Sequence, residues 1–191
     1  MPTILSHAAV PLALGLGLGA RVVSRRLLVA GIIASVLPDF DVLAFHFHVA
    51  YSDALGHRGI SHSIVFAILV ALVTLLLASR LNTTRKTAFL FVAICAVSHG
   101  VLDMFTNGGL GVALLWPWST ERFFAPWQVI EVSPLGIQRV FSQRGIAVLV
   151  SELLWVWLPA TITCAVLSLM RVFVSRTLEK RKSVDKQLRE R

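Results

Sequence analysis

Five long apolar stretches constrain what this chain can fold into more than any other feature of its sequence. They are Ile4–Ala20, Leu27–Phe45, Ile60–Ser79, Thr87–Phe105 and Gly145–Met170. Hydrophobic residues make up 56% of the chain and charged residues only 15%, whereas an ordinary soluble domain is roughly a quarter charged. A run of about 20 apolar residues is long enough to cross a bilayer as a helix. We therefore predict an all-α fold, a polytopic membrane helical bundle of about five transmembrane helices.

The basic residues predict how these helices are oriented. The net charge is +8, and most Lys and Arg residues lie between stretches one and two, between stretches three and four, or after stretch five. Because cytoplasmic loops are enriched in Lys and Arg, these segments are predicted to be cytoplasmic and the N-terminus extracytoplasmic. Residues 1–175 then form the membrane-embedded domain. The basic tail, residues 176–191, is expected to contact anionic lipids, and no nucleic-acid partner is expected.

Residues 106–144 form a long segment without a continuous apolar pattern. The segment is rich in Trp, Phe and Pro, and Trp is enriched where a membrane meets water. We predict that it forms a lid on the extracytoplasmic side of the bundle. Arg122, within this segment, is a candidate to hold a phosphate group, since a guanidinium can form two parallel hydrogen bonds with phosphate.

A small set of ionisable residues interrupts the apolar stretches. In a membrane helix such groups cost about 2.5–3.5 kcal/mol each on insertion scales, so they are treated as functional candidates. With the predicted topology, they fall near the extracytoplasmic ends of the helices and should lie close together. The candidate metal ligands are His7, Asp39, Asp41, His57, His62, His99 and Asp103.

Helical spacing and chain turns support this convergence. His99 and Asp103 are four residues apart and share one face of a helix. Pro38 disfavours helix at the residue before it, so the chain is expected to open at Asp39 and Asp41. A catalytic zinc uses three protein ligands, and this set of His and Asp residues is larger. We therefore expect two divalent ions, zinc or, as the alternative, manganese.

Further charged residues are candidate catalytic groups. Arg58 is expected to hold a phosphate together with Arg122, and either Asp41 or Glu152 is expected to move a proton. For Glu152 three roles stay open, namely metal ligand, partner of Arg58 and helix-packing residue. An outer loop is predicted to hold His46, His48 and Asp53, to which no role is assigned.

The order of these motifs resembles the YdjM-like family of LexA-regulated, membrane-bound metal-dependent hydrolases. The matching strings are Ser6-His7, Leu37-Pro38-Asp39-Phe40-Asp41, His57-Arg58-Gly59-Ile60-Ser61-His62-Ser63, Ser98-His99 with Asp103 and Thr106, and Leu114-Leu115-Trp116-Pro117 with Arg122-Phe123. The resemblance extends from Met1 to about Pro134. It implies a protein of the bacterial inner membrane. The ligand pattern is also similar to that of zinc-dependent phospholipases C, which favours phosphoester substrates.

The sequence contains neither Gly-x-Ser-x-Gly nor His-Glu-x-x-His, so a serine hydrolase or a zincin-type protease is not indicated. We expect a membrane-bound metal-dependent hydrolase that cleaves a phosphoester of a membrane lipid or lipid-linked substrate. A metal-activated water at the outer-leaflet interface would be the nucleophile. Three alternatives stay open: a metal-dependent lipid amidase, a divalent-metal or proton transporter that uses the same cluster, and a membrane protein whose metal site is only structural.

Overall fold

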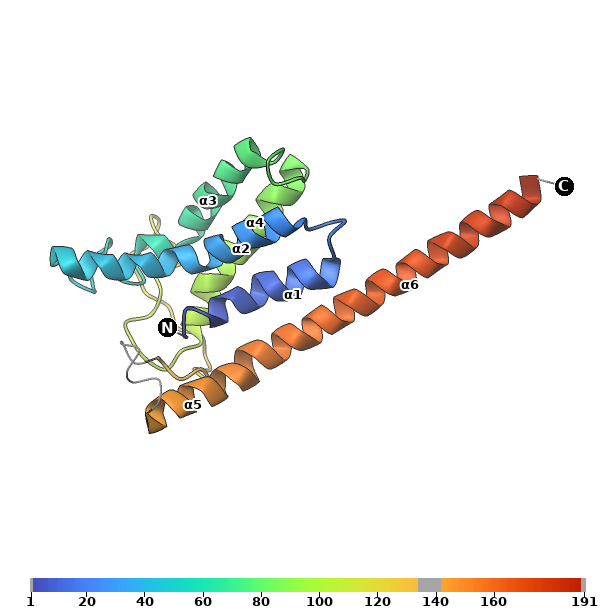
Figure 1. Cartoon of the computed structure of the whole chain (residues 1–191). Coiled ribbons are helices and arrows are strands. Elements are labelled where there is room, and N and C mark those ends of the chain that lie inside the picture. Colours follow the sequence, from blue (N-terminus) through green and yellow to red (C-terminus); the bar gives the residue numbers. More distant parts are fainter. Residues whose placement is uncertain (1, 134–141, 190–191) are drawn as a thin grey trace.

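The computed structural model describes residues 2–133 and 142–189, and helices dominate it (Figure 1). The helices are α1 (Ala9–Leu18), α2 (Arg25–Val36), α3 (Ile64–Leu77), α4 (Arg85–Met104), α5 (Gln143–Glu152) and α6 (Leu158–Arg189). A π-helical turn, Leu153–Trp157, joins α5 to α6 without a break. Over the described ranges no β-strand forms, and the β-type pairing consists of isolated bridges, Thr106 to Ile130 and Val112 to Phe123. The predicted all-α class is confirmed.

All five predicted apolar stretches are helical, but their lengths differ. Three segments, Arg25–Phe47, Arg85–Met104 and Gln143–Glu179, are long and apolar enough to cross a membrane. Ser6–Leu18 and Ile64–Leu77 are shorter apolar helices. At ~1.5 Å of rise per residue, each of the shorter helices is about 20 Å long, less than the ~30 Å hydrocarbon core of a bilayer. The bundle therefore combines helices of spanning length with shorter ones.

Ser and Thr residues define where the helices begin. The side-chain oxygens of Ser24, Ser63, Thr84 and Ser142 each accept a hydrogen bond from a backbone N–H three residues later. Such caps satisfy N–H groups that have no partner within the helix. They mark the first turns of α2, α3, α4 and α5.

Pro38 changes the type of helix instead of opening the chain. The α-helical part of α2 ends at Val36, and Leu37–Phe47 continues as a 3-10 helix with Pro38 in its first turn. Proline is tolerated there because the first N–H groups of a helical segment have no internal partner. The expectation that the chain opens at Asp39 and Asp41 is therefore wrong, since both residues stay helical.

Small residues build the apolar core between α2, α3 and α4. Its buried members include Ala34, Ala67, Ala71, Ala88 and Cys95. Small side chains let helix backbones approach one another closely, as is common in membrane bundles. Gly31 of α2 is one example, because a Cβ at this position would overlap the ring of Phe91 on α4.

Helix α6 lies beside α1 and then extends beyond the rest of the bundle (Figure 1). Arg171 Nη1 donates a hydrogen bond of 3.2 Å to the Leu16 carbonyl oxygen near the end of α1. Many apolar side chains of α6 are exposed, as in a helix that contacts lipid more than protein. The predicted boundary between residues 175 and 176 falls inside this continuous helix, which ends at Arg189.

The predicted lid is irregular over its described part, residues 106–133. Backbone hydrogen bonds join it to the bundle, from Ile64 N to Leu114 O and from Ala125 N to Met104 O. The segment therefore lies against the start of α3 and the end of α4. Residues 134–141 of the predicted lid lie outside the described residues.

Candidate metal centre

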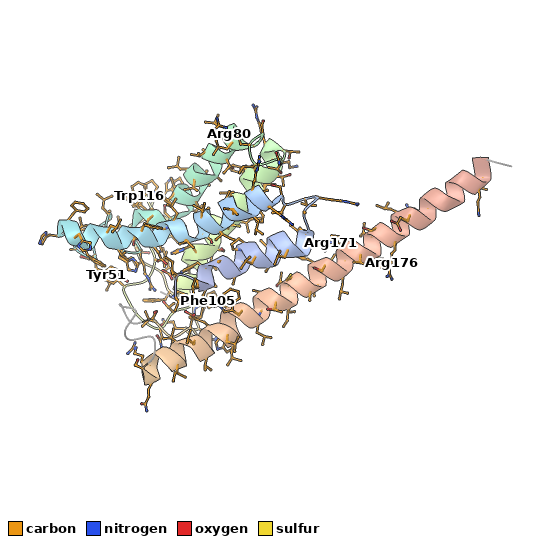
Figure 2. All side chains as sticks on the ribbon, in the orientation of Figure 1. Tyr51, Arg80, Phe105, Trp116, Arg171 and Arg176 are labelled. Carbon is orange, nitrogen blue, oxygen red and sulfur yellow. The ribbon has the colours of Figure 1, made fainter. Side chains whose placement is uncertain are left out.

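The candidate site lies where the 3-10 extension of α2, the turn before α3 and the end of α4 meet. Five side chains converge there, namely His7, Asp39, His62, His99 and Asp103. Each of these residues is at most 3% exposed. Tyr51 and Phe105 mark this end of the molecule in Figure 2. We call these five side chains the inner ligand group.

The imidazole and carboxylate atoms of the inner ligand group face one another. His7 Nε2 lies 3.7 Å from both Asp39 Oδ2 and Asp103 Oδ1. His99 Nε2 is 3.4 Å from Asp39 Oδ1, and His62 Nε2 is 3.2 Å from Asp103 Oδ2. Metal ligands sit about 2.0–2.2 Å from a zinc ion, so ligand atoms of one ion lie a few ångströms apart. One ligand atom each of Asp39, His62, His99 and Asp103 lies within 4.8 Å of the others, which suits a single ion, and His7 stands beside this set.

Buried polar atoms of this group lack hydrogen-bond partners within the described chain. They include both ring nitrogens of His7 and both carboxylate oxygens of Asp39 and of Asp103. Leaving a buried donor or acceptor without a partner costs about 1–3 kcal/mol, and more for a charged group. A divalent cation would serve His7 Nε2 and the carboxylate oxygens together. The donor set therefore fits a metal ion.

A hydrogen bond at Nδ1 fixes the orientation and the protonated nitrogen of the His99 ring. His99 Nδ1 lies 2.7 Å from the Ser35 carbonyl oxygen. A carbonyl only accepts, so Nδ1 carries the proton and Nε2 turns its lone pair toward His62 Nε2, 2.9 Å away, and toward Asp39 Oδ1. This arrangement is typical of histidines that bind metals. The His7 ring stacks on His99 with their centroids 3.7 Å apart.

A second set of side chains, Asp41, His57 and His62, shares His62 with the inner group. His57 Nδ1 lies 2.5 Å from Asp41 Oδ1, and Ser61 Oγ donates to Asp41 Oδ2 at 2.6 Å. The side chains of Asp41 and His57 are each 8% exposed. This outer group is thus already hydrogen-bonded and lies nearer the surface. His46, His48 and Asp53 are exposed and belong to neither group. The prediction that a loop holds all three is wrong for His46, which lies in the last turn of the 3-10 helix Leu37–Phe47.

Arg58 is fully buried and is bonded to protein on several sides. Its Nε lies 3.1 Å from Asp103 Oδ2, while Nη1 donates to the Gly108 carbonyl and Nη2 to Thr106 Oγ1, each at 2.8 Å. Its backbone has φ of 62°, a left-handed conformation that is uncommon for residues other than glycine. The structure therefore places Arg58 as a support for Asp103, and not at a surface where it would meet a phosphate.

Arg122 joins the lid to the loop at residues 51–57. Its Nη1 donates to the His57 carbonyl at 2.9 Å, and its Nη2 donates to the carbonyls of Tyr51 and Asp53 at 3.0 Å. Partial burial lowers the pKa of the Arg122 guanidinium from its ordinary value, and arginine stays protonated at neutral pH nonetheless. The guanidinium N–H groups that were expected to bind a phosphate thus donate to backbone carbonyls of the protein, and those of Arg58 likewise donate to protein groups.

Glu152 lies apart from both ligand groups. It accepts hydrogen bonds from Thr3 Oγ1 at 2.7 Å and from Ser6 Oγ at 2.8 Å, and it is bonded to the backbone N–H of Thr3. No contact between Glu152 and Arg58 appears in the part of the chain that the structure describes. Of the three roles left open for Glu152, this geometry favours helix packing, because Glu152 ties the segment that carries His7 to α5.

Supporting residues were missed by the sequence reasoning. Ser35 contributes only a backbone carbonyl, which no side-chain pattern could indicate. Gly100 permits a close approach, because a Cβ there would stand 2.8 Å from the His62 carbonyl oxygen. The position of this glycine directly after the candidate ligand His99 was a feature of the sequence that could have indicated the close approach.

Comparisons with known proteins agree with the membrane fold. The chain matches the family model described as YdjM inner membrane protein over residues 1–177. It is 51% identical over 168 residues to inner membrane protein YbcI of Escherichia coli (strain K12), which covers 87% of this chain and 97% of that protein. No solved structure matches the chain. The helices of spanning length fit this assignment, and the chain belongs to the YdjM family of inner membrane proteins.

Proposed function

We propose that this protein is a metal-dependent hydrolase that cleaves a phosphoester of a membrane lipid or lipid-linked substrate. The observation that carries the proposal is the inner ligand group, in which the buried carboxylates of Asp39 and Asp103 form no hydrogen bond in the described chain. The charge of Asp103 is offset on one side by Arg58, whose Nε is 3.1 Å from Oδ2, and the remaining carboxylate oxygens face imidazoles. A divalent metal lowers the pKa of a coordinated water to about 7 and stabilises negative charge on a phosphoryl group.

Residues around the inner group have supporting roles in this proposal. Arg58 holds Asp103 in place through Nε, and the Ser35 carbonyl holds His99. The His57 ring stands 5.6 Å from the His62 ring, and Asp41 orients it through Nδ1. We assign to His57 the transfer of a proton between the site and the surface, because it is the more exposed of these imidazoles.

The expected second ion has less support than the first. It would require Asp41, His57 and His62, and Asp41 already accepts hydrogen bonds from Ser61 Oγ and the Arg58 N–H. The orphaned carboxylate oxygens instead belong to the inner group. The proposal therefore rests on one ion, for which imidazole donors favour zinc and the carboxylates also admit manganese.

An apolar cavity near the end of α4 supports a lipid substrate. It has a volume of about 520 Å³ and is lined by Leu102, Phe105, Trp127, Val129, Ile130 and Trp155. Leu102 and Phe105 flank the ligand Asp103 in the sequence. Trp127 is 72% exposed, in keeping with a position at the membrane interface. A cavity of this kind suits an acyl chain.

The alternatives differ in how the structure bears on them. A transporter path needs polar groups at several depths, whereas the buried ionisable side chains of the described residues gather at the site end. This disfavours the transporter. The lipid amidase stays as a second candidate, because Arg58 and Arg122 are both bonded to protein and do not single out phosphate.

Metal analysis and a lipid assay together test the proposal. Elemental mass spectrometry of the detergent-purified protein should find about one zinc or manganese per chain. Phospholipids in mixed micelles should release their phosphate-containing headgroup. His99→Ala should lose both the metal and the activity, while Asp53→Asn, at an exposed carboxylate of the loop, should keep both. Release of fatty acid from an acylated amide would favour the amidase, and absence of metal after reconstitution would refute both hydrolases.

A further inference from the structure

A crevice lies at the end of the bundle opposite the ligand groups. It has a volume of about 760 Å³. One wall is the turn between α1 and α2, residues 18–22, and the other is a stretch of α6, residues 171–179. Figure 2 shows Arg171 and Arg176 on the long helix, well away from Tyr51 at the site end. No ligand residue lies in this crevice, so its role is separate from the proposed hydrolysis.

Positive charge dominates the crevice. Its lining includes Arg21, Arg171 and Arg176 but a single carboxylate, Glu179. Arg171 is fixed by its bond to the Leu16 carbonyl. In the described chain, no ion pair neutralises these arginines. The crevice therefore offers guanidinium groups to an anion.

Gly19 allows the Arg171 side chain to pack closely against the α1–α2 turn. Gly19 has φ of 80°, and a Cβ at this position would overlap the Arg171 guanidinium. The absence of a side chain lets the charged group lie directly on the turn. Arg171 is thus positioned by its contacts with the backbone of the turn, unlike an ordinary surface arginine.

Apolar side chains separate the charges of the crevice. Val22, Val172 and Leu178 line it and are 48%, 44% and 53% exposed. Free phosphate would use only the guanidinium groups, whereas a phospholipid would use both the charges and the aliphatic walls. Basic pockets between transmembrane helices on the cytoplasmic side are known to bind acidic lipid headgroups.

We propose that this crevice binds the headgroup of an anionic phospholipid. Arg21 and Arg176 donate hydrogen bonds to the phosphate, and the fixed Arg171 adds to the positive field. The acyl chains follow the exposed aliphatic residues of α6 into the bilayer. The distribution of Lys and Arg places this end at the cytoplasmic leaflet, where acidic lipids attract basic segments.

Native mass spectrometry of the full chain in detergent tests the proposal. The probe is dioctanoyl phosphatidylglycerol, compared with dioctanoyl phosphatidylcholine and inorganic phosphate. We expect phosphatidylglycerol to bind at least about 10-fold more tightly than phosphatidylcholine, and Arg21→Gln/Arg176→Gln to remove about that factor. Inorganic phosphate that binds as tightly as phosphatidylglycerol would overturn the assignment to a lipid.

A matched double variant distinguishes binding in the crevice from general electrostatic attraction of the lipid to this basic end. Arg25→Gln/Arg85→Gln removes the same charge from exposed positions at the same end, but outside the crevice, and should bind like the wild type. Equal weakening in both double variants would overturn the proposed site. Unchanged metal content in Arg21→Gln/Arg176→Gln would show that the fold and the inner ligand group remain intact. If that variant does not fold, Arg176→Gln on the exposed face of α6 provides the same comparison.

Discussion

The two ends of the bundle accommodate charge in opposite ways. At the site end, Asp39 and Asp103 are at most 3% exposed and face imidazoles. At the basic end, arginines such as Arg26 are exposed, and Arg26 Nη1 donates to the Arg80 carbonyl at 3.0 Å. A buried charge must be compensated by a fixed partner, whereas an exposed charge is stabilised by its surroundings. The site end should therefore be far more sensitive to small changes than the basic end.

Removing the proposed ion should have the largest effect. Loss of one partner from a buried ionic group costs about 3–5 kcal/mol, so chelation should lower the Tm of the purified protein by roughly 6–20 °C. Thermal unfolding followed by circular dichroism would measure this change, and added zinc should reverse it. In Asp103→Ala the chelator should have little further effect. An unchanged Tm after the metal is stripped would mean that the protein itself compensates these carboxylates.

Arg58→Lys should weaken metal binding without unfolding the bundle. Lysine keeps the charge but cannot bond Asp103, Thr106 and Gly108 at once. Loss of such outer support typically reduces metal affinity about 10–100-fold, which competition with a chelator would measure. Arg122→Lys acts on the loop and not on a ligand, so it should change the affinity much less. Equal affinities for wild type and Arg58→Lys would contradict the supporting role.

Gly100→Ala should have a smaller effect that is confined to the site. The added methyl group would stand 2.8 Å from the His62 carbonyl oxygen, so the turn before α3 must move. Overpacking of this kind costs about 1–3 kcal/mol, and we expect metal affinity to fall several-fold. Ser98→Ala on the same helix is the control and should bind metal normally. A normal affinity in Gly100→Ala would show that the His62 turn can move without affecting the ion.

Arg26→Gln should have the smallest effect and should sharpen the contrast between the two ends. Exposed substitutions usually change stability by no more than about 0.5 kcal/mol, so the Tm should shift by less than about 2 °C. The same thermal scan, run beside Arg58→Lys, gives the comparison directly. A shift as large as that of Arg58→Lys would show that the basic end is as tightly constrained as the site end.

The apolar stretches predicted most of the helical segments and the end of the bundle where the ionisable residues gather, but not the helical conformation at Asp39 and Asp41. Apolar length and capping residues are local properties, so α2, α3 and α4 could be located without knowledge of their neighbours. The convergence of the candidate ligands followed from the alternating direction of the helices. His99 and Asp103 also share a face by spacing alone.

The partner of each buried polar atom depends on the tertiary structure and could not be predicted from the sequence. Ser6 and Glu152 are 146 residues apart, and Arg58 and Thr106 are 48 apart. No local pattern indicates that Arg58 supports Asp103, that Arg122 holds a loop, or that Glu152 anchors the N-terminal segment. A hydrogen bond depends on atoms within about 3 Å, whichever part of the chain supplies them. The length of an apolar stretch is a property of consecutive residues, whereas the partners of a buried charge come from segments that are distant in the sequence.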